Sequence, residues 1–133
     1  MSDGIGRYSA LMALLDRDDR YHADATLVWR RLVLQDEPVI CTNYVVVEAI
    51  ALVQRRLGLT AVRRLLQDLI PWLSIEWVQP DVHEAAASAF LTANRRGLSL
   101  VDCASFEVAR RKGVNVTFAY DRHFVEHGFT PIV

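Results

Sequence analysis

Three carboxylates stand among apolar residues in this sequence of 133 residues. Glu48 lies between two apolar runs, Asp102 lies between a valine and a cysteine, and Asp121 comes just after a β-rich segment, 114–119. A charged carboxylate in apolar surroundings is costly unless it is paired, hydrogen-bonded or bound to a metal. If the three acids share one crevice, they indicate a hard divalent cation, Mg²⁺ or Mn²⁺, which prefers oxygen ligands.

Each acid also has a simpler structural explanation when it is taken alone. Asp102 could be the N-cap of a helix, and Asp121 could cap a short segment over residues 122–127. Glu48 gains nothing from capping inside a Val/Ala/Ile-rich helix, so its alternative is a buried partner such as an arginine. These alternatives stay open at the level of the sequence.

The elements that must position these acids alternate between helical and β-rich patterns. Short β-rich runs predict strands at 38–41, 73–78 and 114–119, with an edge strand at 129–133. Helices are expected to begin near Ser9, at His22, after the cap Thr42-Asn43, at the cap Thr60, at Asp81 and near Val101. Glycines are expected to end three of them, namely Gly58 after the third, Gly97 after the fifth and Gly113 after the sixth. This alternation predicts an α/β fold with a mostly parallel sheet and helices on both faces. The functional crevice of such a sheet lies beyond the carboxyl ends of its strands, where the three acids fall.

Charge and composition exclude some classes of protein. With 15 Lys+Arg against 16 Asp+Glu, the net charge is −1, and 52% of the residues are hydrophobic, which excludes a disordered chain. Any nucleic-acid binding must therefore use local charge rather than an overall basic excess. The basic residues that could supply this charge are Arg30-Arg31, Arg55-Arg56, Arg63-Arg64, Arg95-Arg96 and Arg110-Arg111-Lys112. Solvated helix faces are the simpler explanation for any single pair.

Length and apolar patterning favour one domain over residues 1–133. Cys41 and Cys103 are expected to be buried free thiols, with a disulfide as the alternative. The start of the chain has no apolar leader, and no run approaches the ~18 apolar residues of a membrane span, so we expect a soluble, cytoplasmic protein. Most members of a set of large apolar side chains are expected in the core, and some in an exposed patch for self-association or a partner helix; the set is Trp29, Leu57, Leu59, Leu66, Leu69, Ile70, Trp72 and Trp77.

The order and spacing of these motifs resemble PIN-domain ribonucleases, and most closely the VapC toxins of bacterial toxin–antitoxin pairs. The residues that carry the resemblance are Ser9-Ala10-Leu11, Leu14-Leu15-Asp16, Asp18-Asp19, His22, Thr42-Asn43, Glu48, Leu98-Ser99-Leu100-Val101-Asp102 and Asp121-Arg122-His123-Phe124. It extends over essentially the whole chain.

The resemblance implies a three-layer α/β/α sandwich with a parallel five-stranded sheet. It also implies one or two Mg²⁺ or Mn²⁺ ions and endonucleolytic cleavage of RNA by a metal-activated water. Glu48, Asp102 and Asp121 match the second, third and fourth acids of the family, and are thereby the implied catalytic residues and metal ligands. The implied partners are an RNA substrate, a cognate antitoxin and a second copy of the chain in a homodimer.

The chain departs from the family pattern at the first acid. Alignment on Ser9-Ala10-Leu11 puts Arg7 where the family has a central aspartate ligand. The preceding segment, 2–6, contains two glycines and an aspartate, which predicts a poor central strand.

Three explanations of the departure remain open. The N-terminus could be altered, the protein could be a degenerate member, or Arg7 could reach into the acid cluster and replace a cation. The first function hypothesis is therefore a metal-dependent endoribonuclease toxin. The alternative is a PIN-fold module with impaired or no nuclease activity that binds antitoxin or RNA. A flavodoxin-like or receiver-type domain is a more distant third hypothesis, disfavoured because no acidic pair follows the first strand.

Overall fold

The computed structural model describes residues 4–37, 39–120, 126 and 128–131 of the chain. Its strands pair in parallel in one sheet with the order β3-β2-β1-β4-β5. The strands are β1 (Gly4–Gly6), β2 (Val39–Thr42), β3 (Leu73–Glu76), β4 (Val116–Phe118) and β5 (Thr130–Pro131). The chain first builds outward from β1 to β3 and then crosses to β4 on the other side of β1. The sheet therefore has its topological switch point between β1 and β4.

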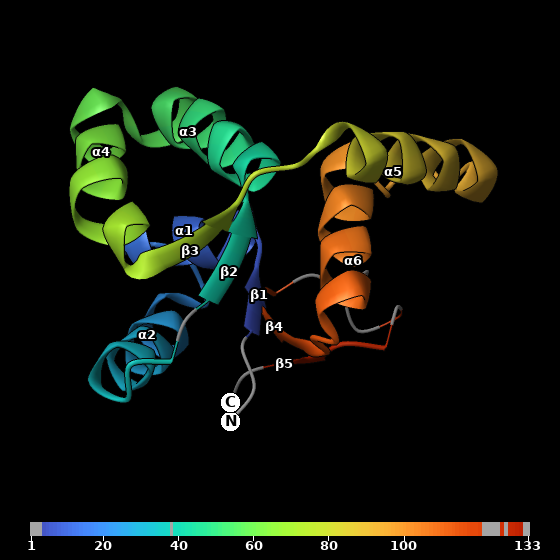
Figure 1. Cartoon of the computed structure of the whole chain (residues 1–133). Helices are drawn as coiled ribbons and strands as arrows, with labels where there is room; N and C mark the ends of the chain where they lie inside the picture. Colours follow the sequence, from blue (N-terminus) through green and yellow to red (C-terminus); the bar gives the residue numbers. More distant parts are fainter. Residues whose placement is uncertain (1–3, 38, 121–125, 127, 132–133) are drawn as a thin grey trace.

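Helices cover both faces of this sheet (Figure 1). They are α1 (Tyr8–Leu15), α2 (His22–Leu34), α3 (Asn43–Leu57), α4 (Leu59–Arg64), α5 (Pro80–Ala93) and α6 (Leu100–Lys112), with the short turns η1 (Leu65–Leu69) and η2 (Ile70–Trp72) before β3. Successive side chains of a strand point to opposite faces. Val39 and Cys41 of β2 accordingly pack with α1 and α2, while Ile40 packs with α6. The predicted α/β class is confirmed.

Local capping explains where α3 and α6 begin and end. The Thr42 hydroxyl accepts a hydrogen bond from the Val45 amide at 3.1 Å, and Gly58, with φ +90°, follows the last residue of α3. Ser99 caps the start of α6 in the same way, and Gly113, with φ +70°, ends it. A positive φ favours glycine. The predicted boundaries of these two helices are therefore confirmed to within a residue or two.

Two other helix boundaries were predicted wrongly. Thr60 does not cap α4, which begins at Leu59 after Gly58 without a side-chain cap. The helix predicted to begin at Asp81 is α5, which ends at Ala93 rather than at Gly97. Asn94 adopts the left-handed conformation there (φ 48°), which asparagine tolerates better than most residues.

The prediction that residues 2–6 make a poor central strand is wrong for the part that the structure describes. Gly4–Gly6 pairs with both β2 and β4, at the middle of the sheet. A Cβ atom at Gly6 would lie 2.7 Å from the Cys41 Sγ and 3.0 Å from a Val39 methyl carbon. Glycine is therefore required here by the close approach of β1 and β2, and its low strand propensity is outweighed by this packing.

Both cysteines are free and buried, as predicted. Burial raises the pKa of the Cys41 thiol to about 12, so the group is a neutral part of the core at ordinary pH. Within the described part of the chain, no helix is long and apolar enough to span a membrane.

Candidate functional site

Arg7 directly follows β1 at the switch point of the sheet. Its amide donates a 3.2 Å hydrogen bond to the Phe118 carbonyl of β4, and its extended backbone (φ −129°, ψ 162°) leads into α1. The side chain is only 7% exposed. The guanidinium carbon also lies 4.5 Å from the centroid of the Tyr8 ring, which is within cation–π range. The main chain thus fixes the base of a cationic side chain at the carboxyl end of the central strands.

The guanidinium of Arg7 binds both carboxylate oxygens of Asp102. The Nε atom donates to Oδ1 at 2.6 Å, and Nη2 donates to Oδ2 at 3.1 Å. Asp102 is 0% exposed, so this is a buried, two-pronged ion pair between residues 95 positions apart. Such forked pairs are the strongest class of charge-assisted hydrogen bond. The explanation in which Arg7 reaches into the acid cluster is therefore confirmed for its contact with Asp102.

Asp102 also belongs to the N-terminus of α6. The Ser99 hydroxyl accepts from the Asp102 amide at 3.0 Å, while Asp102 Oδ2 accepts from the Ser99 amide at 3.4 Å, which together form a capping box. The N-cap is Ser99, so the alternative in which Asp102 itself is the N-cap is wrong. The partial positive charge of a helix N-terminus further favours the carboxylate at this position.

Glu48 lies in the second turn of α3, the helix that follows β2 and packs against α6. Its residue is partly buried, and its Oε1 atom is shielded from solvent. Glu48 and Asp102 are therefore carried by adjacent helices that begin at the same end of the sheet.

Asp121, the third predicted acid, lies outside the described residues. The residue before it, Tyr120, is tightly held: its amide donates to Ser9 Oγ at 3.1 Å, and its hydroxyl donates to Asp24 Oδ2 at 2.5 Å. The Tyr120 ring stacks on Tyr21 with centroids 4.3 Å apart. Burial, and then the hydrogen bond to Asp24, raise the pKa of Tyr120, so it remains a neutral phenol. Tyr21 and Tyr120 were not singled out from the sequence, although Tyr120 lies directly before the candidate acid Asp121.

The described residues, as they stand, do not fit a divalent cation. Both oxygens of Asp102 already accept hydrogen bonds from Arg7, whose guanidinium cannot itself ligate a metal. Among the residues that the structure describes, no group of three His, Cys, Asp or Glu side chains is arranged to hold an ion. The prediction that Glu48, Asp102 and Asp121 together bind a metal stays a prediction.

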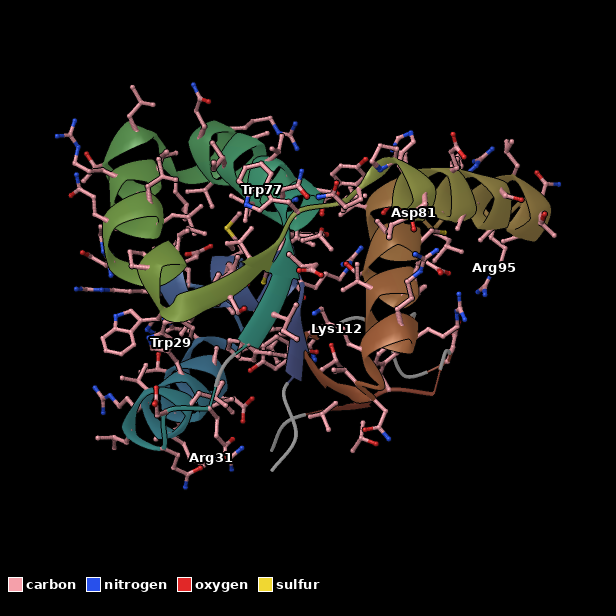
Figure 2. The ribbon with its side chains drawn as sticks, viewed as in Figure 1. Trp29, Arg31, Trp77, Asp81, Arg95 and Lys112 are labelled. Atoms are coloured by element: carbon pink, nitrogen blue, oxygen red, sulfur yellow. The ribbon has the colours of Figure 1, made fainter. Side chains whose placement is uncertain are left out.

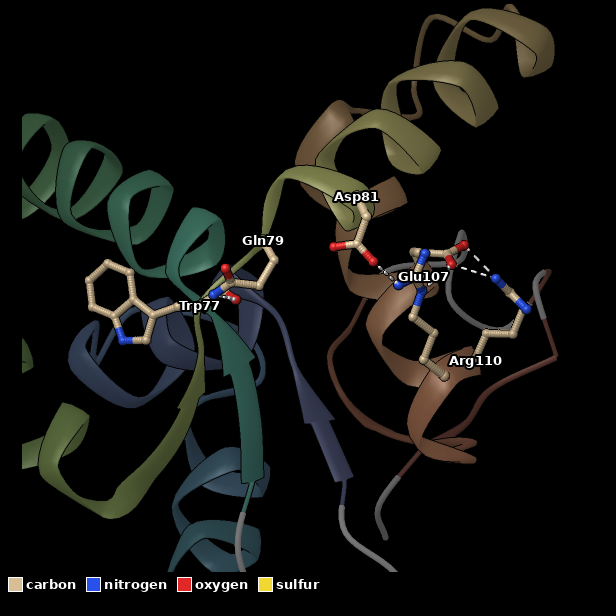
Figure 3. A network of polar contacts seen from close by, with 6 residues as sticks. Trp77, Gln79, Asp81, Glu107 and Arg110 are labelled. Carbon is tan, nitrogen blue, oxygen red and sulfur yellow. Dashed lines mark hydrogen bonds and ion pairs between the residues drawn. The ribbon is translucent and has the colours of Figure 1, made fainter.

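The basic pairs lie on or directly after different helices. Arg31 on α2 and Arg95 after α5 lie on opposite sides of the molecule (Figure 2). The cluster at the end of α6 is neutralised within the protein: Arg111 binds Asp81 and Glu107, each at 2.6 Å, and Arg110 binds Glu107 (Figure 3). Hydrogen bonding to Arg111 holds the pKa of Asp81 and of Glu107 below their usual values. Solvated helix faces therefore describe this cluster well.

In contrast, four exposed arginines of α3 and α4 have no ion-pair partner among the described residues. They are Arg55, Arg56, Arg63 and Arg64. The prediction that some large apolar side chains are exposed is confirmed for four of the eight residues named, which are Leu59, Leu66, Trp72 and Trp77.

The sequence profile of the PIN domain matches residues 9–129 of the chain. The chain belongs to the PIN-domain family. Among curated relatives of this PIN domain, the "23S rRNA-specific endonuclease VapC20" of Mycobacterium tuberculosis is 32% identical over 122 residues, which cover 90% of each chain. The predicted resemblance to VapC toxins is thereby confirmed.

Solved structures of other PIN-domain proteins have the same fold. The crystal structure of Mycobacterium tuberculosis VapC20, described as a sarcin–ricin loop cleaving toxin, aligns over 97% of both chains with a TM-score of 0.81 and 30% identity. DNA-bound VapBC from Salmonella typhimurium and FitAcB from Neisseria gonorrhoeae align over at least 96% of each chain, each with a TM-score of 0.67. At 12% and 14% identity, these two similarities bear on the fold alone.

Proposed function

We propose that this VapC-type PIN domain binds structured RNA and that its metal-dependent cleavage of RNA is suppressed. The observation that carries the proposal is the buried, bidentate ion pair of the Arg7 guanidinium with both oxygens of Asp102. Asp102 would have to be a principal ligand of any catalytic ion at the switch point. With its oxygens held by a guanidinium, no metal-assisted step can be derived from the described residues.

RNA is the proposed ligand because of the VapC20 relative and because of local charge. A relative that is 32% identical is named a 23S rRNA-specific endonuclease, and its crystal structure is that of a toxin cleaving the sarcin–ricin loop. The exposed, unpaired arginines of α3 and α4 supply the phosphate contacts that such a ligand requires.

A second candidate function is an active Mg²⁺- or Mn²⁺-dependent endoribonuclease with Glu48, Asp102 and Asp121 as metal ligands and catalytic residues. The 32% identity with a named endonuclease, over an alignment that covers 90% of the chain, favours this candidate. For this candidate, the Arg7 side chain must leave Asp102 before a cation binds.

The proposed partners are a cognate antitoxin and a second copy of the chain, acting in the cytoplasm, with residues 1–133 as one domain. A cavity of about 290 Å³ between α1, α2, α4 and η1 supports a peptide partner, because it combines apolar walls with charged groups. Its lining includes Trp29 and Leu69 together with Arg17, Arg64 and Asp68. Exposed Trp72 and Trp77 support burial against a further protein surface.

The test uses a synthetic sarcin–ricin loop RNA, with binding measured by fluorescence anisotropy and cleavage by gel. We expect binding in EDTA, and no more cleavage in Mg²⁺ or Mn²⁺ than in EDTA. Metal-dependent cleavage that disappears in Asp102→Asn would establish the second candidate instead. No binding of this RNA or of an unrelated structured RNA would refute the proposal.

A further inference from the structure

We infer that Arg7 is a cation built into the chain that occupies the place of the metal, and that residue 7 alone decides whether this pocket binds a divalent ion. The inference deepens the proposed function, because it names what suppresses the metal site. It predicts a latent metal site that a single substitution restores.

The geometry of the pair meets the requirements of a permanent counter-charge. Arg7 and Asp102 are 6% and 0% exposed, and two N–H···O hydrogen bonds of 2.6 and 3.1 Å join them. Asp102 Oδ2 accepts a further hydrogen bond from the Ser99 amide. The carboxylate is therefore both neutralised and hydrogen-bonded without any ion from solution.

The guanidinium is held in place before any ligand arrives. The Arg7 amide is bound to the Phe118 carbonyl, its backbone leads directly into α1, and its guanidinium packs on the Tyr8 ring. A tethered group competes for Asp102 at a high effective concentration that does not depend on the metal in solution. A divalent ion would have to displace it and would also be repelled by its charge.

Replacement of Arg7 by aspartate reverses this balance. A side chain at position 7 already faces Asp102, so an aspartate there would bring two carboxylates together in a buried pocket. Their repulsion is relieved by a hard cation, whose preferred ligands are carboxylate oxygens. Glu48, on the adjacent helix α3, has an oxygen shielded from solvent and is a candidate for a third ligand.

The experiment measures thermal unfolding of wild type, Arg7→Asp and Arg30→Asp in EDTA and in millimolar Mn²⁺. Arg30→Asp is the matched control, because it makes the same change of charge at an exposed position of α2. We expect no shift for wild type or the control. Arg7→Asp should unfold at lower temperature in EDTA and should rise by about 10 °C when Mn²⁺ exceeds its dissociation constant a hundredfold.

A shift of wild type equal to that of Arg7→Asp would overturn the inference, as would a folded Arg7→Asp with no response. If Arg7→Asp does not fold, calorimetric titration of wild type with Mn²⁺ tests whether the wild-type pocket binds the ion. No binding supports the inference, whereas stoichiometric binding that is lost in Asp102→Asn overturns it. These readouts contain no RNA, so failure of the proposed RNA binding is distinguished from failure of the built-in cation.

Discussion

At the scale of single residues, the Arg7–Asp102 pair combines a large cost with a large gain. Removing two charges from water costs several kcal/mol per ion, and only close, multiple hydrogen bonds offset it. Here the oxygens of Asp102 accept hydrogen bonds from two guanidinium nitrogens and from the amide of the N-cap residue Ser99. The net contribution to stability is therefore modest, but each partner depends strongly on the other.

Removal of one partner should leave an uncompensated buried charge. We expect Arg7→Met to lower the free energy of unfolding by about 3–5 kcal/mol, measured by urea denaturation. The double variant Arg7→Met/Asp102→Asn should lose much less than the sum of the single variants, because neither charge is then isolated. Arg110→Ala, which removes an exposed ion pair with Glu107, is the control and should cost at most about 1 kcal/mol. Additive losses at residues 7 and 102 would contradict a coupled pair.

The buried Cys41 thiol gives a dependence of stability on pH. Its pKa is raised from 9.0 to about 12, so between these values the unfolded chain releases a proton that the folded chain keeps. Stability is therefore fully present below pH 9 and falls as the pH rises above it, by up to about 1.4 kcal/mol per pH unit. Urea denaturation of wild type and Cys41→Ala from pH 8 to about pH 10.5 measures this. The same slope in both proteins would exclude Cys41 as the cause.

At the scale of elements, the local signals predicted helices better than the central strand. Thr42, Ser99, Gly58 and Gly113 are caps whose chemistry acts within a few residues, so α3 and α6 were predictable. The strand β1 was not, because its glycine is required by a neighbour 35 positions away in the sequence, Cys41. Strand propensity is a property of a single residue, so it contains no information on how closely two neighbouring strands approach each other.

We expect Gly6→Ala to destabilise the fold by about 1–3 kcal/mol through overpacking between β1 and β2. The added methyl would meet the Cys41 Sγ at 2.7 Å. In the Cys41→Ala background, where that sulfur is absent, the same substitution should cost clearly less. Thermal or urea unfolding of the four proteins completes the double-mutant cycle. An equal cost in both backgrounds would show that the close contact does not limit this position.

The candidate site was partly predictable from the sequence for a related reason. Asp102 and Arg7 were both singled out from the sequence. Asp102 is an acid among apolar residues, and Arg7 is a base at the position where the family has an aspartate. Their bond joins the end of β1 to the first turn of α6, and it follows only from the crossing of the chain at the switch point. Tyr120 escaped attention because its partners, Asp24 and Ser9, are about a hundred positions away.

At the scale of the whole molecule, a net charge of −1 conceals an uneven distribution of paired and unpaired bases. The bases at the end of α6 are balanced by Glu107, Asp81 and Glu76. The arginines of α3 and α4 have no such partners in the part of the chain that the structure describes. Phosphate contacts are therefore expected at α3 and α4 rather than at the end of α6.

This distribution predicts which substitutions weaken RNA binding. Arg63→Ala/Arg64→Ala should lower affinity for a structured RNA and reduce the slope of log affinity against log salt by roughly 1–2. Arg110→Ala/Arg111→Ala removes the same charge from a neutralised cluster and should change the slope little. Fluorescence anisotropy over a series of salt concentrations measures both. Equal slopes for the two double variants would contradict a phosphate contact at α4.

The most direct test of Arg7 as a built-in counter-charge is a crystal structure of the wild-type protein grown with Mn²⁺, with anomalous scattering used to locate the ion. We expect the Arg7 guanidinium on both oxygens of Asp102 and no anomalous peak beside that carboxylate. A manganese ion bound to Asp102, with the Arg7 side chain displaced, would contradict this role of Arg7.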